Sequence, residues 1–140
     1  MTVIIAVLLC FSIIFWYSYD VYTNQMRETL SVECKYVKAG YEAFGKDFFS
    51  ALSKGDLRIS WIDEKGNILY DSRVQEGEEI GNHMDREEVS EALGDGTGYA
   101  TRYSSTISEF TAYYALRTND GTVIRVSDSQ NGALGMLFNI

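Results

Sequence analysis

The side chains that could bind a ligand are few, and two arginines stand out among them. Arg86 and Arg102 carry guanidinium groups, which bind carboxylates or phosphates through two parallel hydrogen bonds. His83, the single histidine of the chain, has a side-chain type that titrates near neutral pH. With Tyr103 and Tyr113, these residues form the candidate ligand-binding set. The alternative is that both arginines pair with nearby carboxylates and that His83 is structural.

The segment from Asp71 to Asp95 holds most of the excess negative charge of the chain. Its densest part contains Glu76, Glu78 and Glu79, which we consider a weak candidate site for a divalent cation or a cationic peptide. Hard cations prefer several carboxylate oxygens, but the spacing lacks the alternation of an EF-hand. The alternative is a solvated acidic surface.

No catalytic constellation is visible, and we expect neither catalytic residues nor a cofactor. Two cysteines and one histidine cannot form an all-Cys/His zinc site. The glycine-rich stretch 94–98 lacks the lysine of a phosphate-binding loop. With 140 residues and a net charge of -8, the sequence predicts one domain and no nucleic-acid partner.

Residues 1–20 predict a transmembrane anchor. The run from Thr2 to Tyr19 has no charged side chain, and aromatic residues gather at its end, as they do at membrane interfaces. A cleaved signal peptide is the alternative, although no small-residue cleavage pattern follows. Arg27, Lys35 and Lys38 alone would place the folded part in the cytoplasm, and a basic segment ahead of Met1 would change that count. Charge therefore leaves the orientation open.

A long helix is predicted for residues 21–53, because apolar or small residues recur there every three or four positions. We expect a parallel homodimer through Leu30, Cys34 and Val37, with Cys34 near its axis. The same stripe could instead cover a sheet, with Cys34 as a core residue. Gly40 and Gly45 weaken the interior of this helix.

Beyond residue 56 the sequence predicts an α+β fold. Strands are expected at 57–62, 67–70, 98–103, 109–118 and 122–127, and a short helix at 85–93 with Asp85 and Glu88 as a capping pair. This order predicts an antiparallel sheet with its helices on one side, in a domain covering residues 21–130. Residues 131–140 are apolar and predict the start of a second membrane-proximal helix or span.

Two motifs then resemble a known family. The hairpin from Asp63 to Ser72 resembles that of extracytoplasmic PAS-like (single Cache, or PDC) sensor domains. The segment 81–104, with Asn82, His83, Gly98 and Arg102, resembles the corresponding segment of phosphate-regulon-type sensor histidine kinases. Glu87 stands where that family usually has proline.

The resemblance implies a PAS-like five-stranded antiparallel sheet, preceded by a transmembrane helix, that senses a small molecule, ion or protein outside the cytoplasm. It implies a parent protein-histidine kinase (a transferase) of the cell membrane, acting on a response regulator through a kinase domain absent from this chain. His83 is then not the phosphoacceptor. The alternatives are the same fold feeding a chemoreceptor or a diguanylate cyclase, or an adhesion module without signalling output.

Overall fold

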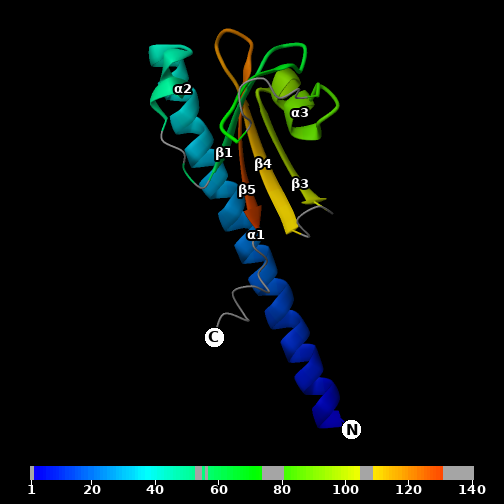
Figure 1. Ribbon diagram of the computed structural model, residues 1–140. Helices are drawn as coiled ribbons and strands as arrows, with labels where there is room; N and C mark the ends of the chain where they lie inside the picture. Colours follow the sequence, from blue (N-terminus) through cyan, green and yellow to red (C-terminus); the bar gives the residue numbers. More distant parts are fainter. Residues whose placement is uncertain (1, 53–54, 56, 74–80, 105–108, 131–140) are drawn as a thin grey trace.

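The computed structural model describes residues 2–52, 55, 57–73, 81–104 and 109–130. Its elements, in chain order, are α1 (Thr2–Phe44), α2 (Asp47–Ala51), β1 (Arg58–Ile62), β2 (Ile68–Asp71), α3 (Glu87–Asp95), β3 (Thr97–Ser104), β4 (Glu109–Arg117) and β5 (Val123–Gln130). The strands form one sheet in the order β2-β1-β5-β4-β3, and every neighbouring pair is antiparallel. The predicted α+β class is confirmed, and such a sheet is consistent with a PAS-like domain (Figure 1).

Helix α1 joins the predicted anchor and the predicted long helix into one rod of 43 residues. Its first part is apolar enough to cross a membrane, and none of that window is buried within the chain. The rod ends at Phe44, earlier than predicted, because Gly45 adopts a φ of 65°. This left-handed conformation suits glycine and turns the chain into α2. At Gly40 the ring of Phe48 from α2 occupies the space that a side chain would fill.

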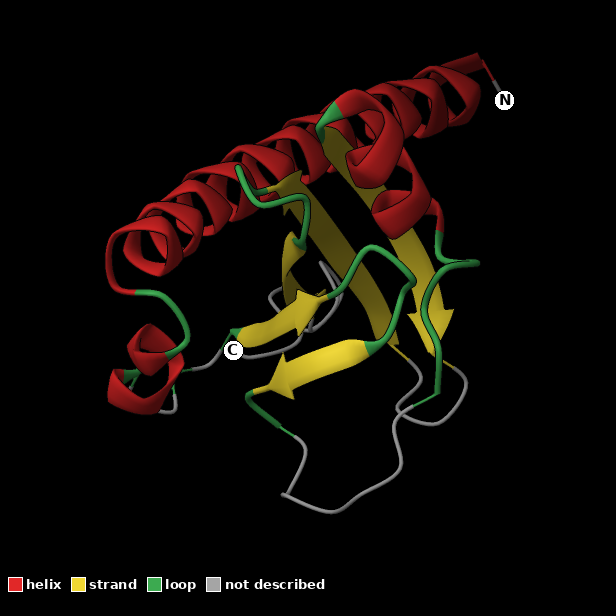
Figure 2. Cartoon of the chain, turned by 90° about the horizontal axis from the view of Figure 1, so that it is seen from above, coloured by secondary structure: helices red, strands yellow, loops and turns green. Residues whose placement is uncertain are grey.

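One face of the sheet packs against the second half of α1. The core on this face includes Leu30, Cys34 and Val37 of the helix, with Ile124 and Val126 of β5 opposite. Because side chains alternate along a strand, the neighbouring residues of β5 point to the other face. Figure 2, seen from above, shows α1 inclined to the strands that it covers.

The other face of the sheet is covered by α3. Val89 and Ala92 of this helix pack on Ile62, Ala115 and Val123. The expectation that all helices lie on one side is therefore wrong, and Figure 1 shows α1 and α3 flanking the sheet. The reason is that β4 and β5 have small or apolar side chains on both faces, so each face needs a covering helix.

The predicted dimer interface is corrected by this packing. Leu30, Cys34 and Val37 are all buried against the chain's own sheet. The Cys34 thiol lies 3.4 Å from the carbonyl oxygen of Ile124, to which it donates a weak hydrogen bond. A residue at this place cannot lie on a dimer axis. The apolar stripe of α1 is therefore a face that covers the sheet, which was the alternative to a coiled-coil seam.

We predict that Cys34 does not react in the folded protein. Its side chain is 0% exposed, and burial raises the pKa of its thiol to about 12, so almost no reactive thiolate forms at neutral pH. In a Cys10→Ser background, mass spectrometry after iodoacetamide treatment should find Cys34 unmodified, and modified once urea unfolds the domain. Rapid alkylation without denaturant, or a disulfide-linked dimer after mild oxidation, would contradict the burial of this thiol.

Candidate functional site

A buried carboxylate lies at the centre of the α3 face. Glu88, in the first turn of α3, is 0% exposed. The two terminal nitrogens of the Arg102 guanidinium, Nη1 and Nη2, donate to its two oxygens at 2.6 and 2.7 Å. Arg125 of β5 donates to Glu88 Oε1 at 3.2 Å. Glu88 therefore ties α3 to strands β3 and β5 through two arginines.

A second charged pair continues from Arg125 toward the edge of the sheet. Arg125 donates to the hydroxyl of Ser60 at 3.2 Å, and that hydroxyl donates to Asp71 Oδ2 at 2.8 Å. The Nε of Arg58 lies 3.0 Å from both oxygens of Asp71. We call Arg58, Ser60, Asp71, Glu88, Arg102, Tyr113 and Arg125 the polar cluster. It joins β2, β1, β5 and β3 to α3 beneath the helix.

The polar cluster has an excess of positive charge. Among the residues that the structure describes, its three guanidinium groups pair with two carboxylates. The ring of Tyr113 offsets part of this excess, with the guanidinium carbons of Arg102 and Arg125 at 4.0 and 5.3 Å from its centre. The Nε of Arg125 is buried and has no hydrogen-bond partner among the described residues. Such an arginine is suited to a further anionic or carbonyl oxygen.

The pKa values follow from this arrangement. Burial raises the pKa of the Glu88 carboxyl, but the hydrogen bonds and charges of Arg102 and Arg125 outweigh burial and hold that pKa below its usual range. The pKa of the Asp71 carboxyl is also lowered, because the hydrogen bonds from Arg58, Arg73 and Ser60 outweigh the effect of burial. Both carboxylates are therefore charged at neutral pH.

Gly98 of β3 makes the close approach of α3 possible. A side chain at this position would collide with the backbone carbonyl oxygen of Glu88. Without a side chain there, the first turn of α3 lies directly on β3, and the Glu88 carboxylate reaches Arg102. The contact between Glu88 and Arg102 therefore depends on Gly98, which lies within the segment 81–104 that resembles sensor kinases.

His83 lies at the edge of the cluster, in the loop before α3. Its ring Nδ1 is buried and has no hydrogen-bond partner among the described residues. Burial lowers the pKa of His83 to about 4, and the positive charges of Arg125, Arg86 and Arg58 add to this effect. The ring is therefore neutral at physiological pH, which disfavours a role as a sensor of pH near neutrality.

The two segments that resemble sensor kinases contact each other. The Asn82 side chain donates to Lys65 O at 2.7 Å and to Asn67 Oδ1 at 3.0 Å. The backbone N–H of His83 donates to Gly66 O at 2.8 Å, and Gly66 has the φ of 82° that this tight turn requires. The β1–β2 turn thus holds the loop that positions His83 and the start of α3.

The remaining candidate residues lie apart from this cluster. Arg86 is exposed and forms a long ion pair with Asp85, with 3.9 Å between Nε and Oδ1. Arg86 occupies the N-cap of α3, which has no side-chain cap, so the predicted capping pair of Asp85 and Glu88 is wrong because Glu88 binds arginines instead. Tyr103 alternates with Arg102 and so lies on the α1 face, away from Tyr113.

Sequence reasoning missed Arg58, Ser60, Asp71 and Arg125, and it missed Glu88 as an ion-pair partner. A signal for Arg125 existed, since it is a charged residue within the apolar run from Val123 to Val126. The proposed cation site at Glu76, Glu78 and Glu79 lies outside the described residues. Among the residues that the structure describes, no group of three His, Cys, Asp or Glu side chains could hold a metal ion.

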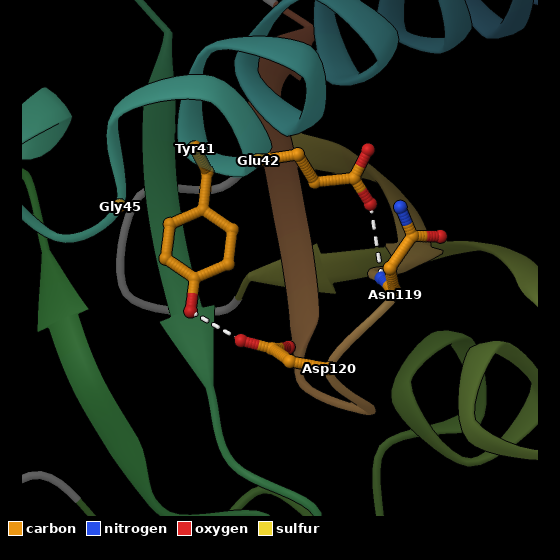
Figure 3. Close-up of a pocket in the computed structure, with 5 residues that line it drawn as sticks. All are labelled: Tyr41, Glu42, Gly45, Asn119 and Asp120. Carbon is orange, nitrogen blue, oxygen red and sulfur yellow. Dashed lines mark hydrogen bonds between the residues drawn. The ribbon is translucent and has the colours of Figure 1, made fainter.

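A small hollow of about 260 Å³ lies at the opposite end of the domain from the apolar part of α1. Figure 3 shows its walls, where the Tyr41 hydroxyl donates to Asp120 at 2.6 Å and Glu42 accepts from the Asn119 backbone at 2.9 Å. These polar groups already have partners, and Asp120 also accepts from Thr118. The contacts hold the end of α1 to the β4–β5 turn, so we assign this hollow a structural role.

Comparison with known proteins bears on the fold. No family model matches the chain, and no curated protein matches it. The structure of the YkuI protein of Bacillus subtilis, which has an EAL domain, matches 84% of this chain at 16% identity with a TM-score of 0.52. The extracellular domain of rpHK1S-Z16, named as a predicted histidine kinase, matches 70% at 15% identity, with a TM-score of 0.45 that is too low to carry an argument. The chain spans 37% and 40% of these two proteins, and the first likeness shows a shared fold alone.

We predict an acid-induced loss of stability that depends on His83. The unfolded chain binds a proton at this histidine near pH 6.5, whereas the folded chain resists protonation until about pH 4. The stabilising effect is complete above pH 6.5 and is lost as the pH falls toward 4. In urea unfolding followed by circular dichroism, His83→Gln should remove most of the stability difference between pH 7 and pH 5. An equal acid loss in wild type and His83→Gln would show that His83 titrates normally.

Proposed function

We propose that this chain is the signal-sensing part of a membrane-bound sensor histidine kinase, with its folded domain outside the cytoplasm. The observation that carries the proposal is the continuity of α1, which runs without a break from an apolar, membrane-length segment to the core of the sheet. A rearrangement of the sheet would therefore act directly on the membrane-spanning part. The resemblance of segments 63–72 and 81–104 to phosphate-regulon-type sensor kinases supports a histidine kinase as the output of the sensor.

The polar cluster is the part of the domain best suited to detect a ligand. Glu88 is an internal carboxylate that occupies two arginines, and the cluster still has an excess of one positive charge. A ligand with a carboxylate or phosphate group could replace Glu88 on Arg102 and bind the free Nε of Arg125. Displacing Glu88 would release the first turn of α3 from β3. Ligand binding and a change of packing would then be the same event.

The kinase output distinguishes this proposal from its alternatives. Membranes containing the whole protein should incorporate labelled phosphate from ATP, and Glu88→Gln should change that rate because it removes the charge that holds α3. Absence of ATP-dependent phosphorylation would favour a chemoreceptor or diguanylate cyclase output. If phosphorylation occurs but no variant of the polar cluster alters its rate, the domain is only a tether and does not control the kinase.

We predict that the folded domain faces the outside of the cell. Tyr36 is 70% exposed on α1, seventeen residues beyond Tyr19 and so about 25 Å from the end of the apolar run. In a Cys10→Ser background, the cysteine introduced by Tyr36→Cys should react with a membrane-impermeant maleimide in intact cells, while Cys34 stays buried. Labelling only after cell lysis would place the domain in the cytoplasm.

We also predict that Arg102 determines binding of an anionic ligand. A panel of inorganic phosphate, sulfate and dicarboxylates, tested by calorimetry on the chain in nanodiscs, should give a ligand whose affinity falls at least tenfold in Arg102→Gln, about 1.4 kcal/mol. Arg27→Gln is the matched control, because it removes the same charge from the α1 face, where Arg27 lies over Tyr99. Equal losses in both variants would indicate a general charge effect rather than a site at the cluster.

A further inference from the structure

Two aromatic side chains at one end of the sheet are not covered by any helix or strand that the structure describes. Tyr103, near the end of β3, is 56% exposed, and Phe110, near the start of β4, is 50% exposed. The two residues are register partners, and their rings pack edge to face with centroids 5.2 Å apart. Both lie on the α1 face by alternation with Tyr99 and Ala112, yet α1 does not cover them. We call Tyr103 and Phe110 the aromatic tip.

The aromatic tip lies at the end of the sheet that faces the apolar half of α1 (Figure 1). Arg27 of α1 lies over the ring of Tyr99, with 5.2 Å between the guanidinium carbon and the ring centre. From Tyr99, strand β3 continues four residues, about 13 Å, toward the membrane side before it reaches Tyr103. From Arg27, the end of the apolar run at Tyr19 is eight residues, about 12 Å, in the same direction. Because β3 is inclined to α1, Tyr103 descends by part of its 13 Å and lies within about 12 Å of the level of Tyr19.

A second strand places the aromatic tip at a similar level. Met26 of α1 packs against the core that includes Val126 of β5. From Val126, strand β5 continues four residues toward the apolar part of α1 (Figure 1) and reaches Gln130, which is the register partner of Phe110. Met26 is seven residues, about 10 Å, beyond Tyr19. Phe110 therefore lies at the end of the domain nearest to the apolar run.

We propose that the aromatic tip contacts the headgroup layer of the same bilayer that α1 crosses. The headgroup regions extend the hydrocarbon core of about 30 Å to a total of about 40–45 Å, so each layer adds roughly 5–8 Å above the level of Tyr19. The interval of up to about 12 Å between the levels of Tyr103 and Tyr19 is filled by three contributions. They are this headgroup layer, the length of an aromatic side chain and an ordinary helix tilt of about 20°. Tyrosine is enriched at this depth, where one end of the ring meets apolar and the other polar surroundings.

The chemistry of the aromatic tip determines which bilayer surface fits. Both of its residues are uncharged, so the partner is a zwitterionic surface such as phosphatidylcholine or phosphatidylethanolamine, which needs no basic side chains to bind it. The contact rests on the membrane anchor of the proposed function but not on the orientation of the domain, because either leaflet presents such a layer. It would fix the sheet to the membrane at a second point beside α1.

Quenching by brominated phosphatidylcholine, with bromine near the top of the acyl chain, tests this contact in the full chain reconstituted in vesicles. In a Trp16→Phe background, the indole introduced by Phe110→Trp should lose emission, as expected for an aromatic ring at the interface. Its signal is the difference from Trp16→Phe alone, because Trp61 also emits. Tyr103→Trp should behave alike, which guards against a variant that fails to fold. Tyr36→Trp is the matched control on the exposed side of α1, and it should not be quenched.

The controls separate the possible failures. Quenching of Trp16, obtained by comparing wild type with Trp16→Phe, reports the anchor itself. If Trp16 is not quenched, the membrane anchor of the proposed function is wrong. If Trp16 is quenched but neither tip variant is, only the present inference is overturned. An unquenched tip whose blue-shifted emission disappears at a tenfold higher lipid-to-protein ratio would likewise overturn it, and would show that a second copy of the chain covers the tip.

Discussion

The carboxylate of Glu88 constrains the α3 side of the domain more than any other group. A buried carboxylate costs several kcal/mol of desolvation, which only well-placed partners offset. Arg102 supplies two short hydrogen bonds and Arg125 a third, and they reach Glu88 only because Gly98 has no side chain. Removing one partner of such a pair leaves an uncompensated charge, typically at a cost of about 3–5 kcal/mol. The helix, the central strand and the edge of the sheet therefore depend on one another through a single side chain.

The strands were predictable because their signals are local. Alternating side chains and the glycine turns at Gly66 and Gly121, both with positive φ, fix the hairpins over a few residues. The end of α1 was not predictable to the same precision, since Gly45 could have stayed within a helix and Gly40 does. Which of the two glycines ends the helix depends on how Phe48 packs back onto α1, and that packing is a tertiary contact.

The candidate site was predictable only in part, for a related reason. Arg102 was identified from its type, but its partner Glu88 is fourteen residues away and was assigned to a cap by its local spacing. Arg125 is thirty-seven residues from Glu88, and no local pattern relates the two. The stripe through Cys34 shows the same limit, because a sheet-covering face and a coiled-coil seam have the same three- and four-residue spacing. Sequence periodicity shows that a face is buried but not what buries it.

In the proposed sensor, these contacts would also determine how a signal leaves the domain. Helix α1 is held at its far end by Tyr41, which donates to Asp120, and along its length by the buried contacts of Cys34 and Leu30 with the sheet. It has no break between this packing and the apolar run, so it has no internal hinge at which a movement would be absorbed. The α3 side, in contrast, is joined to the same strands by ionic groups that a charged ligand could rearrange. Strand β5 contributes Ile124 to one face and Arg125 to the other, and it therefore connects the polar cluster directly to helix α1.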